Sequence, residues 1–546
     1  MRSTRRVPAK NSFLTILLLL FLLGSSAGVA SYLLSQPNRP ASTGGDGGGT
    51  TVPPDPIGGK PVYDLIIKGG TVVDGSGGPV RRADVGVIGD RITALGDLSK
   101  ASAKKTIDAT GLAVAPGFIN IHSHTPDYLP DNKAYRDAWA AIRQGITLEV
   151  GGADGRSPTD LTAHFQRIID GGGLNYNLAT MVGQGSVRQA VMGTVTRAAT
   201  GAEIDRMRSL VRQAMKDGAF GLSTGLEYVP GRYTSQSEVT ALAAEVAPFG
   251  GIYATHMRNE AAQLPQAVDE AIAIAKQAGV ALDISHIKAA GRPNWPLFPG
   301  VLDRIDAARA GGQNIIADMY PWRSLDKTVD LRLADVRNSY QPQDLLVRKS
   351  SGYSEYLGST LADIATKMGV TPVVAADRLL AKDPETAVAA LVMSDDNIKL
   401  GLGRAFTAIS NDDEAYPIFD DPQKILAVHP RAHGTFPLIL GSYVRDQKVL
   451  TLETAVYKMT GLPAKFLGLK DRGLIKEGYF ADLVVFDPKT VNSRATYVTP
   501  QLPPAGILYV AVNGVLEVSD GQPVTVKDAA GNMIGPRAGR ILRKGQ

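Results

Sequence analysis

Four of the seven histidines in this chain stand at the ends of short apolar runs that are typical of β-strands. The run GFINIH is followed by Ser123 and a second histidine, so His122 and His124 share one face if the strand continues. The runs GIYATH and ALDISH end in His256 and His286. Imidazoles that converge at one place are typical of a divalent metal site, and zinc, as one or two ions, is the metal that we expect.

An anionic side chain would complete such a site, and ITLEVGGADGRSP offers two. Asp154 lies just past the end of the apolar run, where a ligand belongs, and is the favoured residue. Glu149 lies inside the run, where it can instead be buried against a basic partner, and is the alternative. The chain has no cysteine, so it forms no disulfide and any metal must be held by nitrogen and oxygen atoms.

A further acidic pair follows the run RAFTAIS, where Asp412 and Asp413 are adjacent. A carboxylate at this place can act as a general base toward water and then as an acid toward a leaving group. Because neighbouring strand residues point to opposite faces, one of the two should face the site; Asp412 is favoured on register and Asp413 is the alternative. The pair Asp395 and Asp396 follows Ser394 and is expected to begin a helix.

The elements that position these residues are eight strand-like runs alternating with helical patterns. The runs are residues 117–122, 146–152, 178–183, 218–224, 251–256, 281–286, 313–320 and 404–410. Most begin roughly 30 to 40 residues apart, which is the length of a βα unit, and eight such units close a barrel with its active site at the carboxyl ends of the strands. The long last gap predicts an insertion over residues 321–403, a position where insertions often serve as lids.

The two flanks of this region have a different sequence pattern. Residues 62–115 and 471–546 hold short β-branched runs with frequent turns, which predicts antiparallel β-sheet on both sides of a barrel over 116–470. Residues 1–35 combine four basic residues with an uncharged apolar stretch, which indicates a signal peptide or an N-terminal membrane anchor. Residues 36–60 are rich in Gly and Pro and predict a flexible linker.

These features indicate an exported protein, periplasmic or anchored in the membrane and facing outward. Membrane association through the N-terminal segment is then possible. The net charge is +5, with much of the excess in the N-terminal arm, and no basic patch is interleaved with aromatic residues, so we expect no nucleic-acid partner.

Together these motifs resemble the N-acyl-D-amino-acid deacylases (D-aminoacylases) of the amidohydrolase superfamily. The resemblance runs from about residue 62 to 546. It is carried by IDATGLAVAPGFINIHSH, RQGITLEVGGADGRSP, GLSTGLEYVPGRY, THMRNE, SHIKAAG, HPRAHGTFP and GLKDRGLIKEGYFADLVVFDP. It implies an α/β fold in which a metal-dependent (β/α)8 barrel is joined to a β-sandwich built from both flanks. It also implies a small-molecule substrate, an N-acyl-D-amino acid, whose amide bond is hydrolysed to a carboxylate and a free D-amino acid.

The resemblance also implies roles for residues that the pattern alone leaves open. It assigns His122, His124, His256 and His286 to the metal, and Asp412 to catalysis. It further implies that Tyr320 polarises the scissile carbonyl and that Lys288 and Arg431 bind the substrate carboxylate. Without it, these three residues would be interpreted as a packed aromatic, a surface lysine and a structural arginine, and His429 and His433 would line the pocket or support their loop.

Two departures from the family bear on these expectations. Many members carry a cysteine ligand where this chain has Asp154, and an aspartate should hold zinc less tightly than a thiolate. The segment after Tyr320 matches the family poorly, so the preferred side chain is left open. Two rival functions are another amidohydrolase reaction, such as cyclic-amide (hydantoin or dihydropyrimidine) or dipeptide hydrolysis, and a catalytically silent envelope-binding protein.

Overall fold

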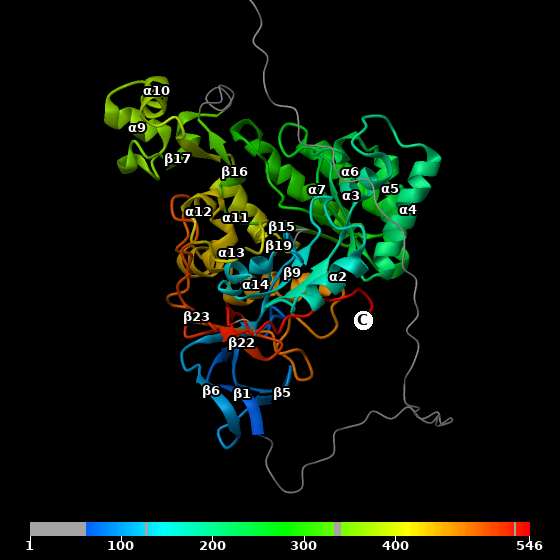
Figure 1. Cartoon of the computed structure of the whole chain (residues 1–546), viewed down its shortest axis with the longest axis vertical. Coiled ribbons are helices and arrows are strands. Elements are labelled where there is room, and N and C mark those ends of the chain that lie inside the picture. Colours follow the sequence, from blue (N-terminus) through cyan, green and yellow to red (C-terminus); the bar gives the residue numbers. More distant parts are fainter. Residues whose placement is uncertain (1–61, 126–128, 332–339, 529–530) are drawn as a thin grey trace, which may run out of the picture. The chain divides into compact units, whose positions relative to one another are not determined.

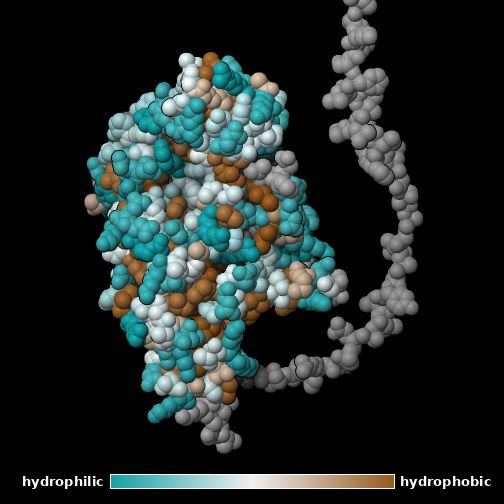
Figure 2. All heavy atoms as spheres, turned by 90° about the vertical axis from the view of Figure 1, so that its left-hand side faces the viewer, coloured by the Kyte–Doolittle hydropathy of each residue, from teal (hydrophilic) through white to brown (hydrophobic). Residues whose placement is uncertain are grey.

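The structure is a computed structural model that describes residues 62–125, 129–331, 340–528 and 531–546. The predicted signal or anchor segment, 1–35, and the predicted linker, 36–60, lie outside these ranges. Among the helices that the structure does describe, none combines the length and the apolar content needed to cross a membrane. On the face drawn in Figure 2, hydrophilic residues predominate and apolar residues are exposed in smaller groups between them.

The central part of the chain is a barrel of parallel strands, as the spacing of the strand-like runs predicts. A strand or strand pair lies at each of the eight expected places. They are β8 (Phe118–Asn120), β9 (Ile146–Gly151), β10 (Asn177–Thr180) with β11 (Val182–Gly183), β12 (Gly221–Gly225), β13 (Ile252–His256), β14 (Ala281–Ile284), β15 (Ile315–Met319) and β19 (Thr407–Ile409). Neighbours pair in parallel, and a parallel bridge between Ser123 and Asp413 joins the last strand to the first.

Helices follow the strands and pack outside them (Figure 1). Between the strands lie α1 (Trp139–Ile142), α2 (Leu161–Asp170), α3 (Gln184–Met192), α4 (Gly201–Lys216), α5 (Gln236–Ala243), α6 (Leu264–Ala278) and α7 (Phe298–Ala310). Their ends carry the expected signals: Thr200 and Glu203 form a capping box at the start of α4, and Gly279 ends α6 with a φ of +70°. After β19 come α12 (Pro422–Ala427), α13 (Arg431–Leu438), α14 (Leu452–Met459) and α15 (Gly461–Leu467).

The segment between β15 and β19 contains a small structure of its own. Strands β16 (Ser324–Asp330), β18 (Ala387–Leu391) and β17 (Leu345–Lys349) form an antiparallel sheet, accompanied by α9 (Leu361–Met368) and α10 (Pro372–Lys382). Helix α11 (Asp395–Gly403) begins after Ser394, whose side chain accepts from the backbone N–H of Asn397, which confirms the predicted helix start. This helix contacts α7, β15 and β19 and so continues the outer ring of the barrel.

The flanks of the chain form two further sheets, blue and red in Figure 1; the first sheet is built from the first flank alone and the second from both flanks. The first has the order β5 (Arg91–Gly96), β4 (Asp84–Ile88), β1 (Val62–Lys68), β6 (Ser102–Asp108). The second has the order β23 (Gln522–Pro523), β22 (Val515–Ser519), β21 (Ile507–Val512), β20 (Leu483–Phe486), β7 (Ala113–Pro116), β2 (Thr71–Val72), β3 (Arg81–Arg82). A hairpin of β24 (Val526–Lys527) and β25 (Met533–Ile534) follows.

Apolar residues from both flanks share one core, with Ile67 and Val85 from the first and Leu483 and Ala511 from the second. The predicted α/β fold, a barrel with a β-sandwich built from both flanks, is confirmed.

Candidate metal centre and active site

The four strand-end histidines meet at the carboxyl ends of the barrel strands. The ring centroids of His122 and His124 lie 5.2 Å apart, those of His122 and His286 lie 4.9 Å apart, and those of His256 and His286 lie 4.6 Å apart. His256 Nδ1 lies 2.9 Å from His286 Nε2. Residues that are 164 positions apart in the chain therefore present their ring nitrogens to one place.

Asp154 lies between the two pairs of histidines. Its Oδ1 is 3.5 Å from His122 Nε2 and 3.6 Å from His286 Nε2. Its Oδ2 is 3.4 Å from His256 Nδ1 and 3.8 Å from His124 Nε2. Burial would raise the pKa of Asp154, but His256 and His122 hold it well below its usual range, so the carboxylate is anionic.

Glu149, the alternative ligand, points elsewhere. It is fully buried in β9, and its Oε2 accepts a hydrogen bond of 2.6 Å from Asn120 Nδ2. Burial raises the pKa of Glu149 to about 8. No cluster of potential metal ligands in the described ranges includes Glu149, whereas two clusters include Asp154.

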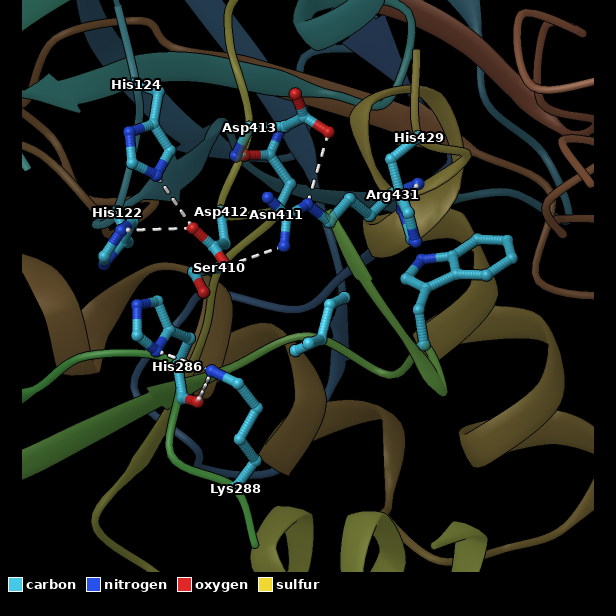
Figure 3. Close-up of polar contacts among 12 residues, drawn as sticks. His122, His124, His286, Lys288, Ser410, Asn411, Asp412, Asp413, His429 and Arg431 are labelled. Atoms are coloured by element: carbon cyan, nitrogen blue, oxygen red, sulfur yellow. Dashed lines mark hydrogen bonds and ion pairs between the residues drawn. The ribbon is translucent and has the colours of Figure 1, made fainter. Parts of the chain in front are cut away.

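The Asp412 carboxylate links His122 and His124 to the guanidinium of Arg431 (Figure 3). Its Oδ1 lies 3.2 Å from His122 Nε2 and 2.9 Å from His124 Nε2, and its Oδ2 accepts a hydrogen bond of 2.7 Å from Arg431 Nη1. Burial would raise the pKa of Asp412, but Arg431, His286 and His122 hold it well below its usual range. The carboxylate is therefore ionised and able to accept a proton.

The expectation that only one of the adjacent aspartates faces the site is wrong. Arg431 Nε also lies 3.3 Å from Asp413 Oδ2, and Asp413 lines the same cleft. The alternation of side chains fails because β19 ends at Ile409 and Asp412 adopts a left-handed φ of +53°. Asp412 is nevertheless the one whose oxygen reaches the histidines.

The donor set fits a divalent metal. The buried atoms His122 Nε2 and Asp154 Oδ1 have no hydrogen-bond partner among the described residues. Three triplets of ligand atoms, each within 4.8 Å of one another, combine these residues: His122–His124–Asp154, Asp154–His256–His286 and His122–His286–Asp412. Imidazole nitrogen and carboxylate oxygen are ligands that zinc accepts, so the residues present fit one or two zinc ions.

Three carboxylates that contact the histidines were not predicted from the sequence. Asp318 Oδ2 lies 3.4 Å from His122 Nδ1, Glu260 Oε1 lies 2.9 Å from His286 Nδ1, and Glu227 Oε2 lies 3.1 Å from His256 Nε2. Each orients a histidine by its remaining ring nitrogen, which is how metal-binding imidazoles are commonly held. A signal for two of them was present, because Glu227 and Glu260 stand in the motifs GLEYVPG and THMRNE.

The two predicted substrate cations, Lys288 and Arg431, both lie close to the ring of Tyr320. Lys288 Nζ is 5.9 Å and Arg431 Cζ is 4.8 Å from the centre of the Tyr320 ring. Lys288 donates to Glu260 over 2.7 Å and contacts His286 Nδ1 at 2.9 Å. Burial would lower the pKa of Lys288, but Glu260 and its neighbours raise it above its ordinary value, so the amine carries its charge.

A cleft of about 500 Å³ opens at this place. Its lining includes His124, Asp154, His256, His286, Lys288, Tyr320, Asp412 and Arg431. The cleft is also lined by Leu325, Tyr340 and Ala390, which belong to the segment between β15 and β19. His429 and His433 are buried and do not line it; His429 Nδ1 accepts from the backbone N–H of Arg431 over 3.0 Å and so supports the loop.

A parallel barrel with a histidine and aspartate metal site at its carboxyl end defines the chain as an amidohydrolase. A profile described as the Amidohydrolase family matches residues 350–517. A D-aminoacylase of Alcaligenes xylosoxydans xylosoxydans is 37% identical over 509 residues, covering 88% of this chain and 98% of that protein. An N-acyl-D-glutamate deacylase of the same organism is 36% identical, covering 88% and 96%.

A solved structure is similar over the same range. The N-acyl-D-glutamate deacylase of Bordetella bronchiseptica, complexed with zinc and a phosphonate inhibitor, is 33% identical with a TM-score of 0.72, covering 88% of this chain and all of that one. The chain belongs to the family of N-acyl-D-amino-acid deacylases.

Proposed function

We propose that this protein hydrolyses the amide bond of N-acyl-D-amino acids, yielding a carboxylate and a free D-amino acid. The observation that carries this proposal is one cleft in which a metal site, a proton acceptor and two buried cations face each other. A zinc ion bound by the histidines and Asp154 would polarise the amide carbonyl and lower the pKa of water.

The side chains then have separable tasks. Asp412 accepts the proton of the attacking water and delivers it to the leaving amine nitrogen, for which its ionised state and position beside His122 and His124 suit it. Burial raises the pKa of Tyr320 to about 12, so its hydroxyl keeps its proton and donates a hydrogen bond to the carbonyl oxygen. Lys288 and Arg431 bind the free α-carboxylate.

The test is a substrate library. The full chain, loaded with zinc, is assayed for release of amino acid from N-acetyl-D- and N-acetyl-L-amino acids, with the Asp412→Asn variant as the control for contaminating activity. We expect turnover of D substrates only. Absence of D-selective turnover on every substrate contradicts the proposal.

Arg431→Met separates this proposal from the rival cyclic-amide reaction. Loss of the guanidinium should raise KM strongly for N-acyl-D-amino acids, because the α-carboxylate loses a charged partner. A hydantoin or dihydropyrimidine has no free α-carboxylate, so its KM should be far less affected. The kcat of both reactions should fall, because Arg431 also donates to Asp412 over 2.7 Å. Turnover of cyclic amides that exceeds turnover of linear ones would favour the rival.

We further propose that the protein is exported and acts outside the cytoplasm. The basic start followed by an uncharged apolar stretch within residues 1–35 supports this proposal. Cell fractionation combined with the mass of the mature N-terminus tests it. Recovery of the full-length chain in the cytoplasmic fraction would contradict it.

A further inference from the structure

One cation in the cleft lining has no part in the chemistry described above. Arg156 lines the cleft and is exposed, whereas Lys288 and Arg431 are 5% and 2% exposed. Within the ranges that the structure describes, the Arg156 guanidinium makes neither an ion pair nor a hydrogen bond. The cleft therefore presents an unused positive charge to whatever binds in it.

The backbone that carries Arg156 is held on both sides. The N–H of Gly155 donates to Ser223 Oγ over 3.0 Å, and the N–H of Arg156 donates to Ala153 O over 3.0 Å. On the other side, Ser157 Oγ accepts from the N–H of Gly183 over 2.8 Å. These bonds fix the loop to β11 and β12. The Arg156 side chain therefore extends from a defined point of the cleft wall and not from a loose loop.

The loop is also closely packed. A side-chain carbon added at Gly155 would lie 2.9 Å from the backbone N of Gly225, and one added at Gly183 would lie 2.4 Å from the carbonyl carbon of Gly155. The backbone of this loop therefore packs directly against the neighbouring strands, where no side chain would fit. The loop contacts therefore define the point on the cleft wall from which the Arg156 side chain extends.

The order of strands in the closed barrel places Arg156 across the mouth of the barrel from Lys288 and two strands from the strand that precedes Arg431. Arg156 follows the second strand, β9, whereas Lys288 follows the sixth, β14, and Arg431 comes after the eighth, β19. If the amino-acid half of a substrate lies at Lys288 and Arg431 with its amide over the histidines, the acyl half extends toward the second to fourth strands.

We propose that Arg156 binds an anionic group on the acyl half of the substrate, so that the preferred acyl groups are dicarboxylic, such as succinyl. This inference rests on the proposed function and names the substrate class of the same site. A guanidinium can engage both oxygens of a carboxylate. The neighbouring acid in this part of the lining, Glu227, is already engaged by His256 Nε2 at 3.1 Å.

The reach of the site sets the length of that acyl group. Arg156 is two residues from Asp154, so their Cα atoms lie no more than about 7.6 Å apart. The carbonyl of the acyl group would lie at the metal site, and its far end would meet the Arg156 side chain. The acyl group must therefore be short. A three- to five-carbon diacid spans such a distance, whereas a formyl or acetyl group does not reach it.

The test compares N-succinyl and N-butyryl derivatives of the same D-amino acid, because the two acyl groups have similar length and differ in charge. In the full-length, zinc-loaded protein we expect kcat/KM to favour the succinyl substrate. Arg156→Met should lower kcat/KM for the succinyl substrate about tenfold or more and leave the butyryl substrate nearly unchanged. Arg206→Met, which removes an exposed arginine on α4, is the matched control and should change neither.

A variant with reversed charge at Arg156 gives a second test of the same role. Arg156→Glu should disfavour the succinyl substrate further and favour an acyl group that ends in an amine, such as 4-aminobutyryl. Equilibrium binding of N-succinyl- and N-butyryl-D-amino acid to the zinc-loaded protein, measured by calorimetry, gives a readout that needs no turnover. The succinyl preference in binding should weaken with salt because Arg156 is exposed.

The outcomes distinguish the role of Arg156 from the proposed deacylase function. Turnover of N-butyryl substrates with no succinyl preference, or equal effects of Arg156→Met on both, overturns the role of Arg156 and leaves the proposed function intact. A lack of turnover on every N-acyl-D-amino acid overturns the proposed function, and the binding comparison then decides on Arg156.

Discussion

At the scale of single residues, Asp154 and Glu149 stand five positions apart and face different surroundings. Asp154 has oxygens between 3.4 and 3.8 Å from four imidazole nitrogens, while Glu149 accepts from Asn120 inside the barrel. Asp154→Asn should therefore weaken zinc binding by more than the roughly 10- to 100-fold that loss of an orienting partner costs. Glu149→Gln should leave zinc content unchanged.

Competition with a chromophoric chelator measures both affinities, and circular dichroism shows whether each variant is folded. If zinc content falls for Glu149→Gln and not for Asp154→Asn, the assignment of the anionic ligand is wrong.

The two adjacent aspartates after β19 should also behave differently. Asp412 reaches His122 and His124, whereas Asp413 Oδ2 lies 3.3 Å from Arg431 Nε. Asp412→Asn should lower kcat by roughly 10²- to 10⁴-fold, because an amide cannot carry the proton to the leaving amine. Asp413→Asn should lower it much less. Steady-state kinetics at matched zinc content checks this, and equal losses would mean that the pair acts as a unit.

At the scale of elements, the loop after β9 depends on glycine. Gly152 has a φ of +75°, and a side-chain carbon there would lie 2.2 Å from Met181 O. Gly250 has a φ of +62° with open space around it. Gly152→Ala should therefore lower the thermal midpoint and the zinc affinity, whereas Gly250→Ala adds only the backbone strain of about 1 kcal/mol.

Differential scanning calorimetry with and without zinc tests this pair. Equal shifts for the two variants would show that the destabilisation comes from backbone strain and not from crowding against Met181.

The strands of the barrel could be predicted because each apolar run ends in a turn signal or a functional residue, and this pattern is local. The strand-end residues could be predicted for the same reason: His122, His256 and His286 come at the ends of their runs. The orientation of Asp413 could not be predicted, because it depends on the left-handed φ of Asp412.

The carboxylates that contact the histidines were missed for a different reason. Asp318 contacts His122, almost 200 residues earlier in the chain, and only the closed barrel brings them together. An acidic residue inside a strand gives no local sign of such a partner. The domain boundaries drawn from composition and the functional roles of Tyr320, Lys288 and Arg431 stay predictions.

At the scale of the whole molecule, a buried acid couples stability to pH. Glu517 in β22 is fully buried, and burial raises its pKa from 4.5 to about 8. Between pH 4.5 and about 8 the folded state therefore binds more protons than the unfolded state. The contribution of Glu517 to folding stability is greatest below pH 4.5 and is lost as the pH rises to about 8. Glu517→Gln should match the wild type in acid and raise the thermal midpoint at pH 8 to 9.

Thermal unfolding across this pH range checks the prediction, with exposed Glu355→Gln as the control. A variant whose midpoint is no higher than that of the wild type in alkali would mean that Glu517 is ionised without penalty.

The sandwich built from both flanks also has a consequence for the time course of folding. Arg91 near the start of the described chain bonds to Asp471, 380 residues later, and β7 pairs with β20 across a similar distance. At ribosomal speeds, roughly 20 to 80 s pass before the partner of an early strand has been made. Strands β2, β3 and β7 of the first flank therefore cannot complete the second sheet until β20 has been made. Its half-made edge must be kept from pairing with other chains until the last strands arrive, so expression should respond strongly to chaperones that hold unfolded chains.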